Sequence, residues 1–323
     1  HKAIMLTLTV AAPRCGPGYW KMNNSLLYDN EYCNGIRDII HYVKSGEYFA
    51  NYSKTFLWEY LKKRIREYSI HIGIMRSRDK KDEIMRLEQE LRDIDSIVQL
   101  DDERLLRKEL IQNRLHELYT EKSKGAQLRA KVQETDEVEC NYRLFNGIEK
   151  CKQTNNVIKS LINSNGKEVS DQQEILDIMG QFYNNLYQSN EIDEANIDDL
   201  LNSITMDNIL SENDKRKLEK MPTVEEFSFV LHKIKERKSP GLDGITIEFY
   251  KHFWNDLKDL YCDLICEVWT VEILPHTTRS SVLSTIFKAD ARNDLQNYRP
   301  LSLTNCDYKI LAFVFAERMQ CVI

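Results

Sequence analysis

The chain has 323 residues, of which 42% are hydrophobic and 30% are charged, and its net charge is −6. This length allows about two domains, and the negative charge excludes a protein that attracts nucleic acid over its whole surface. The charge is unevenly spread, because residues 61–132 hold 18 Lys and Arg against 14 Asp and Glu. Any contact with nucleic acid is therefore expected to be local.

Eight cysteines are scattered along the chain, unlike the dense spacing of a disulfide framework. Cys262 and Cys266 lie one helical turn apart without two further ligands at zinc spacing, so we expect them on a buried helix face. No apolar run approaches the roughly 20 residues of a transmembrane helix. We therefore expect an intracellular protein, cytoplasmic or nuclear, that is neither secreted nor bound to a membrane.

The first half of the chain is expected to be mainly helical. Residues 1–10 partly alternate apolar and polar side chains, which predicts one half-buried strand. Ser53 is a candidate N-cap for a helix whose apolar residues recur at helical spacing. From 78 to 120, a heptad seam runs through Ile84, Leu87, Leu91, Ile94 and Val98 and resumes at Ile111, Leu115 and Leu118. The pattern fits a helical hairpin within one chain and a dimer of two chains equally well.

The second half mixes helices with two small hairpins. Residues 163–167 read Asn-Ser-Asn-Gly-Lys, a strong turn signal between short apolar runs. The segment from Glu191 to Asp214 holds eight acidic residues and no Lys or Arg, which favours an exposed connector. Thr223 and Glu226 form a capping-box signature at the start of a further helix.

A larger hairpin is predicted near the end of the chain. Residues 282–287 and 298–303 are expected to be its strands, and Asp307 is a candidate cap for a final helix. Lys288 would place a mobile positive charge on this hairpin, and Arg299 a planar guanidinium group that can donate two hydrogen bonds to phosphate oxygens. Together the two side chains would suit a triphosphate. Spacing alone fits two solvated cations better.

The segment Ser239-Pro240-Gly241-Leu242-Asp243-Gly244 is a turn with two glycines between helices. Its backbone amides could approach a phosphate closely. A plain inter-helix turn is the simpler interpretation of the same residues.

In their order and spacing, several segments resemble the reverse transcriptase of LINE-type non-LTR retrotransposons. The resemblance is carried by the 239–244 segment, Phe287-Lys288, the run Asn297-Tyr298-Arg299-Pro300-Leu301-Ser302-Leu303, and Asp307 to Leu311. Upstream, Phe182 to Tyr187 and the Gly-Pro-Gly-Tyr-Trp-Lys-Met-Asn run at 16–23 also match. An intron maturase, another reverse-transcriptase lineage, would explain the hairpin residues but neither the 16–23 run nor His1.

The resemblance implies roles for individual residues. Lys288 and Arg299 would contact the triphosphate of the incoming nucleotide, although the family usually has Pro where Phe287 stands. Ser239, Pro240, Gly241, Asp243 and Gly244 would lie on the template side. His1 would be the last catalytic residue of the family's endonuclease, a remnant here because the preceding Asp is missing.

The resemblance also implies what the parent protein needs. It would nick DNA and copy an RNA template at the nick with Mg²⁺, so its partners would be template RNA and target DNA. The Tyr/Phe-x-Asp-Asp box that holds the metal ions in this family is absent from the 323 residues. No metal ligand or cofactor is therefore assigned to this stretch.

We expect a mostly α fold with a small β contribution (α+β). Residues 1–12 would be the last strand of an endonuclease/exonuclease/phosphatase-type domain, and 13–220 a helical linker and N-terminal extension that is coiled-coil-like at 78–120. Residues 221–323 would be the reverse-transcriptase fingers, ending before the palm. The expected function is that of an inactive polymerase fragment that binds RNA or nucleotide. The alternative is a non-catalytic helical interaction protein that self-associates through the seam.

Overall fold

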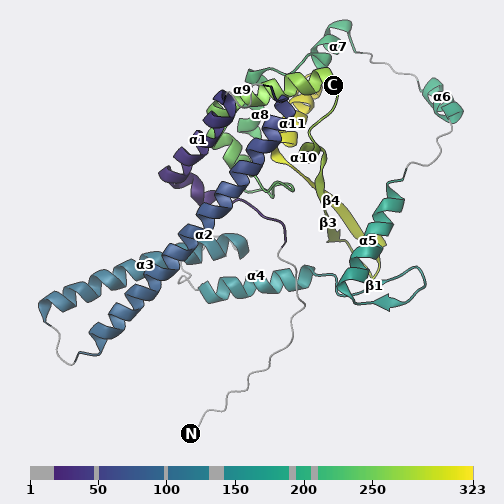
Figure 1. The fold of residues 1–323 in the computed structure, drawn as a ribbon. Helices are drawn as coiled ribbons and strands as arrows, with labels where there is room; N and C mark the ends of the chain where they lie inside the picture. The colour runs from purple at the N-terminus through teal and green to yellow at the C-terminus, as the bar shows by residue number, and fades with distance from the viewer. Residues whose placement is uncertain are drawn as a thin grey trace. The chain divides into compact units, whose positions relative to one another are not determined.

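The structure is a computed structural model that describes residues 18–46, 51–97, 101–130, 142–188, 194–204 and 210–322 (Figure 1). These residues form a mostly helical fold with two small antiparallel sheets, which confirms the predicted fold class. The predicted strand at residues 1–10 lies outside the described residues. The chain divides into a helical unit, His1–Gly18 and Ile74–Lys159, and a core unit, Tyr19–Gly73 and Ser160–Ile323.

The helical unit contains an antiparallel pair of long helices. It is formed by the second part of α2 (Lys54–Asp95) and by α3 (Asp102–Ala130), followed by α4 (Tyr142–Asn156). The described seam residues pack together, namely Ile84, Leu87, Leu91, Ile94, Ile111, Leu115 and Leu118. Ion pairs join Glu83 to Arg114 and Glu90 to Arg107, so increasing numbers on α2 face decreasing numbers on α3. Of the two arrangements left open by the heptads, this chain therefore adopts the hairpin.

The core unit begins with a short 3-10 helix, η1 (Asn24–Tyr28), and α1 (Asn30–Ser45). The Asp29 carboxylate caps α1 by accepting a hydrogen bond from the Glu31 backbone N–H at 3.0 Å. The predicted cap of α2 is confirmed, because the Ser53 hydroxyl accepts a hydrogen bond from the Phe56 N–H at 3.1 Å.

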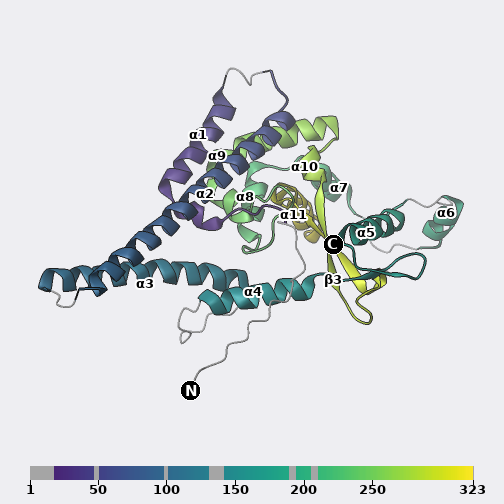
Figure 2. The same cartoon turned by 60° about the horizontal axis from the view of Figure 1, so that its bottom comes forward.

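The centre of the core unit is α9 (Ile247–Val271), whose buried face carries Phe249, Phe253, Leu257 and Tyr261. Around it pack α1, α8 (Val224–Lys233) and α11 (Cys306–Gln320), which Figures 1 and 2 show gathered together. The predicted capping box of α8 is present, with both reciprocal bonds between Thr223 and Glu226 formed. Burial of these aromatic and aliphatic side chains supplies the main stabilisation of the unit.

The smaller predicted hairpin is confirmed as β1 (Leu161–Ile162) and β2 (Glu168–Val169), and it is followed by α5 (Gln172–Leu186). The acidic segment is exposed where it is described, but it is not simply a connector. It contains α6 (Glu194–Ser203) and the start of α7 (Glu212–Glu219), which Ser211 caps. Apolar residues at helical spacing in α6 account for the difference, since acidity alone does not oppose a helix.

The larger predicted hairpin is also confirmed. A short helix, α10 (His276–Arg279), leads into β3 (Ser281–Phe287), and β4 (Tyr298–Thr304) returns antiparallel to it after a 3-10 turn, η3 (Leu295–Asn297). Asp307 does not cap the final helix: Asn305 occupies that position, and the Asp307 side chain is buried in the first turn. Its carboxylate serves a contact inside the core instead.

The two cysteines expected on a buried helix face differ in burial. Cys262 is partly buried and Cys266 is exposed, so the prediction holds in part for Cys262 and is wrong for Cys266. No helix in the described ranges is both long and apolar enough to cross a membrane.

The helical hairpin gives a first prediction. Replacing Ile111, which is 1% exposed, by Asp places an unpaired charge in the seam and should lower the free energy of unfolding by about 3 kcal/mol. Its neighbour Leu110 is 54% exposed, so Leu110→Asp should change stability by at most about 0.5 kcal/mol. Urea unfolding followed by circular dichroism measures both. Equal losses would show that α2 and α3 do not pair through this seam.

Candidate nucleic-acid interface

The β3–β4 hairpin places Lys288 and Arg299 on one face. Arg299 pairs with Ile286, and side chains alternate between faces along a strand, so Lys288 follows Ile286 on the same side. The Lys288 N–H donates to the Asn297 carbonyl at 2.8 Å, which continues the register one pair beyond the strands. Lys288 and Arg299 are thus diagonal neighbours across the ribbon. Both side chains are exposed, and neither forms an ion pair with a described residue.

The turn beyond Lys288 is held by polar and aromatic contacts. The Tyr298 hydroxyl donates to the Arg292 carbonyl at 2.7 Å, and the Arg292 guanidinium lies 4.4 Å from the centre of the Phe287 ring. The β1–β2 hairpin also contacts this turn, because the Ile162 N–H donates to the Asn293 carbonyl at 2.8 Å. These contacts fix the end of the ribbon that presents Lys288 and Arg299.

The segment 239–244 is mostly buried. Ser239 and Leu242 are exposed, whereas Pro240, Gly241, Asp243 and Gly244 are not. A Cβ atom at Gly241 would fall 2.5 Å from the backbone nitrogen of Asn305, so only glycine permits this approach to the β4–α11 junction. Gly244 has φ +74° and would place a Cβ against the Trp20 carbonyl oxygen.

The N-terminal run and the 239–244 segment, both singled out from the sequence, lie against each other. The Met22 N–H donates to the Gly244 carbonyl at 2.9 Å, and the Tyr19 hydroxyl donates to the Pro240 carbonyl at 3.3 Å. The Thr246 hydroxyl donates to the side-chain carbonyl of Asn24 at 2.7 Å. Residues 19–24 therefore cover one side of the 239–244 segment.

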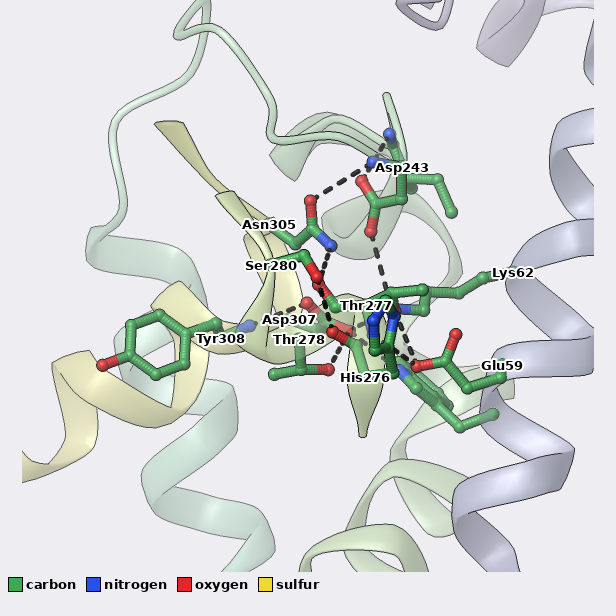
Figure 3. A network of polar contacts seen from close by, with 12 residues as sticks. Glu59, Lys62, Asp243, His276, Thr277, Thr278, Ser280, Asn305, Asp307 and Tyr308 are labelled. Carbon is green, nitrogen blue, oxygen red and sulfur yellow. Dashed lines mark hydrogen bonds and ion pairs between the residues drawn. The ribbon is translucent and has the colours of Figure 1, made fainter. Parts of the chain in front are cut away.

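Behind the segment lies a buried charge cluster of Lys62, Asp243 and Asp307 (Figure 3). The Lys62 Nζ atom is 2.8 Å from Asp307 Oδ2 and 3.7 Å from Asp243 Oδ2. The Lys62 and Asp307 side chains are 4% and 1% exposed. Lys62 comes from α2, Asp243 from the 239–244 segment and Asp307 from α11, so the cluster joins three distant parts of the chain.

Asp307 has the more complete set of partners. Besides Lys62, its Oδ2 atom accepts hydrogen bonds from Trp58 Nε1 at 2.9 Å and from the Thr278 hydroxyl at 3.2 Å. Its Oδ1 atom accepts from the Tyr308 N–H at 2.8 Å. Asp243 Oδ2, by contrast, has no hydrogen-bond partner among the described residues.

This difference in partners sets the ionisation of the cluster. Burial opposes ionisation of Asp307, but the Lys62 charge and the hydrogen bonds from Lys62 and Trp58 outweigh it and hold the pKa of Asp307 below its usual value. Burial and the neighbouring Asp307 charge raise the pKa of Asp243 to about 7. Burial would lower the pKa of Lys62, but the two carboxylates raise it. Near neutral pH, the cluster is therefore an ion pair of Lys62 and Asp307 beside the Asp243 carboxyl group, which is partly protonated.

Asn305 connects this cluster to both ends of the hairpin. Its side-chain oxygen accepts a hydrogen bond from the Asp243 N–H at 3.2 Å, and its amide donates to the Thr277 carbonyl at 2.7 Å. The Thr277 N–H in turn donates to the Glu59 carboxylate at 3.0 Å. The residues just before β3 and just after β4 are therefore bonded to each other, to α2 and to the 239–244 segment.

The predicted site residues thus fall into three groups. Lys288 and Arg299 are brought together, and His1 lies outside the described residues. Of the five residues in the 239–244 segment, Pro240, Gly241, Asp243 and Gly244 contact residues 19–24 or Asn305, whereas the Ser239 carbonyl accepts a hydrogen bond from Lys309. Contact of the segment with a template stays a prediction, and its exposed side chains are those of Ser239 and Leu242. Sequence reasoning missed Lys62, although it stands between Trp58 and Ile65 on the apolar face of α2, where a charged side chain needs a buried partner.

A metal site is not formed by these carboxylates. Among the described residues, no three His, Cys, Asp or Glu side chains are grouped so that they could hold an ion. Asp243 and Asp307 share the Lys62 ammonium group, which occupies the place that a cation would take. The Mg²⁺ ions implied for the parent polymerase therefore do not fit this cluster.

No family model matches the chain. Along its whole length it is similar to the transposon TX1 uncharacterized 149 kDa protein of Xenopus laevis, with 28% identity over 330 residues. The match covers 100% of this chain and 24% of that protein, so the chain spans about a quarter of the length of this relative. The similarity supports a transposon-derived protein.

The cluster gives a prediction about stability. Asp307→Asn keeps the shape of the side chain but leaves the Lys62 charge without its nearest partner, and we expect a loss of about 3 kcal/mol or more. The matched control is Asp259→Asn, which removes an exposed partner of Lys44 at 2.9 Å and should cost at most about 1 kcal/mol. Denaturant unfolding at pH 7 measures both. Similar costs would mean that Lys62 is not buried as a charge.

The cluster also gives a prediction about pH. Because folding raises the pKa of Asp243 from 3.8 to about 7, its proton stabilises the fold fully below pH 3.8, and this contribution is lost as the pH rises through 7. One such group gives a slope of at most about 1.4 kcal/mol per pH unit. Asp243→Asn keeps the oxygen that accepts from the Ile245 N–H but cannot ionise.

The stability of the wild-type protein relative to Asp243→Asn should therefore fall between pH 5 and pH 8, and urea unfolding at several pH values measures this difference. A difference that does not change with pH would contradict a proton on Asp243. An increase with pH would place the proton elsewhere in the cluster.

Proposed function

We propose that the chain supplies the template-side and nucleotide-side surfaces of an RNA-directed DNA polymerase of the LINE type. The observation that carries this proposal is the position of Lys288 and Arg299, two exposed cations without ion-pair partners on one face of the β3–β4 hairpin. Arg299 can hold two phosphate oxygens at once and Lys288 can reach a third, which suits a triphosphate.

The similarity to a transposon protein supports the same proposal. So does the packing of the 239–244 segment, because its contacts with residues 19–24 give it a fixed shape. The template would lie along the exposed side of this segment, and the triphosphate along the face of the hairpin. In the parent, target-primed copying of RNA would follow nicking of DNA by an endonuclease.

We further propose that residues 1–323 bind RNA or nucleotide without polymerising by themselves. Two-metal nucleotidyl transfer needs carboxylates that hold two ions about 3.5–4 Å apart. The described residues offer no such group, and the carboxylates of the buried cluster are held by Lys62. An intracellular location, nuclear or cytoplasmic, remains part of this proposal.

The alternative function, helix-mediated self-association, would need a surface other than the predicted seam. The seam residues are packed within the α2–α3 hairpin. Leu106 and Leu110 on α3 lie close to the seam in sequence, and they remain accessible at 59% and 54% exposure. A concentration-dependent mass in sedimentation equilibrium, abolished by Leu106→Asp, would favour this function.

The direct test is binding of a deoxynucleoside triphosphate and of a single-stranded RNA by the whole chain, followed by fluorescence anisotropy. Arg299→Ala removes charge-assisted bonds to phosphate and should weaken triphosphate binding at least about tenfold, which corresponds to 1.4 kcal/mol. Lys288→Ala should give a smaller loss. Both losses should shrink at high salt, because phosphate contacts release counterions.

The matched control is Arg216→Ala, which removes an exposed arginine from α7. It should leave triphosphate and RNA affinity unchanged. If Arg216→Ala and Arg299→Ala weaken binding equally, the contact is non-specific and the hairpin is not a nucleotide site. If the wild-type chain binds neither ligand, the proposed function fails for this stretch.

A further inference from the structure

The base of the β3–β4 hairpin and the 239–244 segment meet at Lys62. Thr277 and Thr278 stand before β3, and Asn305 and Asp307 stand after β4. The Lys62 ammonium group donates to Asp307 and to the Thr277 hydroxyl, and it pairs with Asp243 of the segment (Figure 3). One side chain of α2 therefore contacts both ends of the hairpin and the segment beside it.

We infer that Lys62 is a positioning residue that holds the 239–244 segment and the β3–β4 hairpin in one fixed arrangement. Its consequence for ligand binding rests on the proposed function, because the segment would carry template and the hairpin would carry the triphosphate. Lys62 itself is 4% exposed and would touch neither ligand. It acts through Asp307, Thr277 and Asp243.

Stability alone does not explain a charge at this place. Replacing a buried ion pair with apolar side chains of similar size is often neutral or stabilising, so a leucine or methionine could fill the same volume. An apolar contact is not directional, however, whereas an ammonium group with three donors fixes where its acceptors stand. The cluster therefore specifies the relative position of three segments, which is a separate property from holding them in the core.

The surroundings of Asp243 make this arrangement sensitive to pH. The charged or titratable groups that face the cluster are Glu59 and Lys62 from α2, Glu248, Tyr250 and Tyr261 from α9, and Cys306, Asp307 and Lys309 from α11. Lys62 is the cation that pairs with Asp243, so it stabilises the negative charge that Asp243 acquires when it loses its proton. Removing Lys62 should shift that proton loss to higher pH.

The experiment uses the whole chain with three variants. Lys62→Met removes the charge, and Lys62→Met with Asp307→Leu replaces the closest ion pair with apolar side chains, which preserves folding if the single variant fails to fold. Lys44→Met is the matched control, since it removes an exposed ion pair with Asp259 between α1 and α9. Hydrogen exchange is measured by mass spectrometry in residues 239–246, 281–304 and 254–268, the last as a reference within α9.

The expected result is at least tenfold faster exchange in both 239–246 and 281–304 for the two Lys62 variants, with 254–268 unchanged. Lys44→Met should match the wild type in all three segments. RNA affinity measured between pH 6 and pH 9 should change around pH 7 for the wild type and at higher pH for Lys62→Met. A purely structural role of the side chain would leave this pH profile in place.

Two results overturn the inference. One is a folded double variant in which both segments exchange at the wild-type rate. The other is faster exchange throughout α9 as well, which would make Lys62 a general stabilising residue. If the two segments loosen selectively but the wild-type chain binds neither RNA nor triphosphate, the positioning role is supported and the proposed function is contradicted.

Discussion

The arrangement of the core unit depends on a buried ion pair between the Lys62 ammonium group and the Asp307 carboxylate. Lys62 extends from α2 into the interior and meets Asp307 at 2.8 Å, and its charge, together with the hydrogen bonds from Lys62 and Trp58, keeps that carboxylate ionised. A charge at this depth must be paired, because the loss of hydration is large. The positions of α10, α11 and the 239–244 segment follow from this requirement, since each supplies a group to the cluster or to Asn305 beside it.

The 239–244 segment and the β3–β4 hairpin, which we propose bind template and triphosphate, are attached to this cluster at different distances. The 239–244 segment touches it directly through Asp243, and its glycines allow the close approach of Asn305 and Trp20. The hairpin is anchored by the residues that precede β3 and follow β4, while Lys288 and Arg299 lie at its far end.

Local patterns in the sequence were sufficient for the elements themselves. The strands of the larger hairpin, the Asn-Gly turn of the smaller one and the Thr223–Glu226 capping box of α8 were all predicted from residues that are neighbours in the sequence. The heptad seam did not distinguish a helical hairpin within one chain from a dimer of two chains, because both have the same apolar spacing. The acidic segment was judged by its charge, and its helical apolar spacing was overlooked.

The buried cluster could not be predicted, because its members are far apart in the sequence. Its neighbours in the sequence made Asp307 a candidate helix cap. In the fold it is a core residue, because Lys62 and Trp58 of α2 contact its carboxylate. Asp243 lies in a segment expected on the template side, and nothing in its neighbouring residues indicates that its carboxylate is buried beside Lys62. Only Lys62 could have been recognised from the sequence, because it is a charged residue near Trp58 on an apolar helix face.

The most direct test of this account is the titration of Asp243 and Asp307 by carbon-13 NMR of the side-chain carboxyl groups, assigned with the Asp243→Asn and Asp307→Asn variants. We expect Asp307 to titrate with a pKa below the usual range of aspartates and Asp243 to titrate with a pKa of about 7. Two aspartates that both titrate near 3.8 would contradict it, because they would be hydrated and Lys62 would not be enclosed between them.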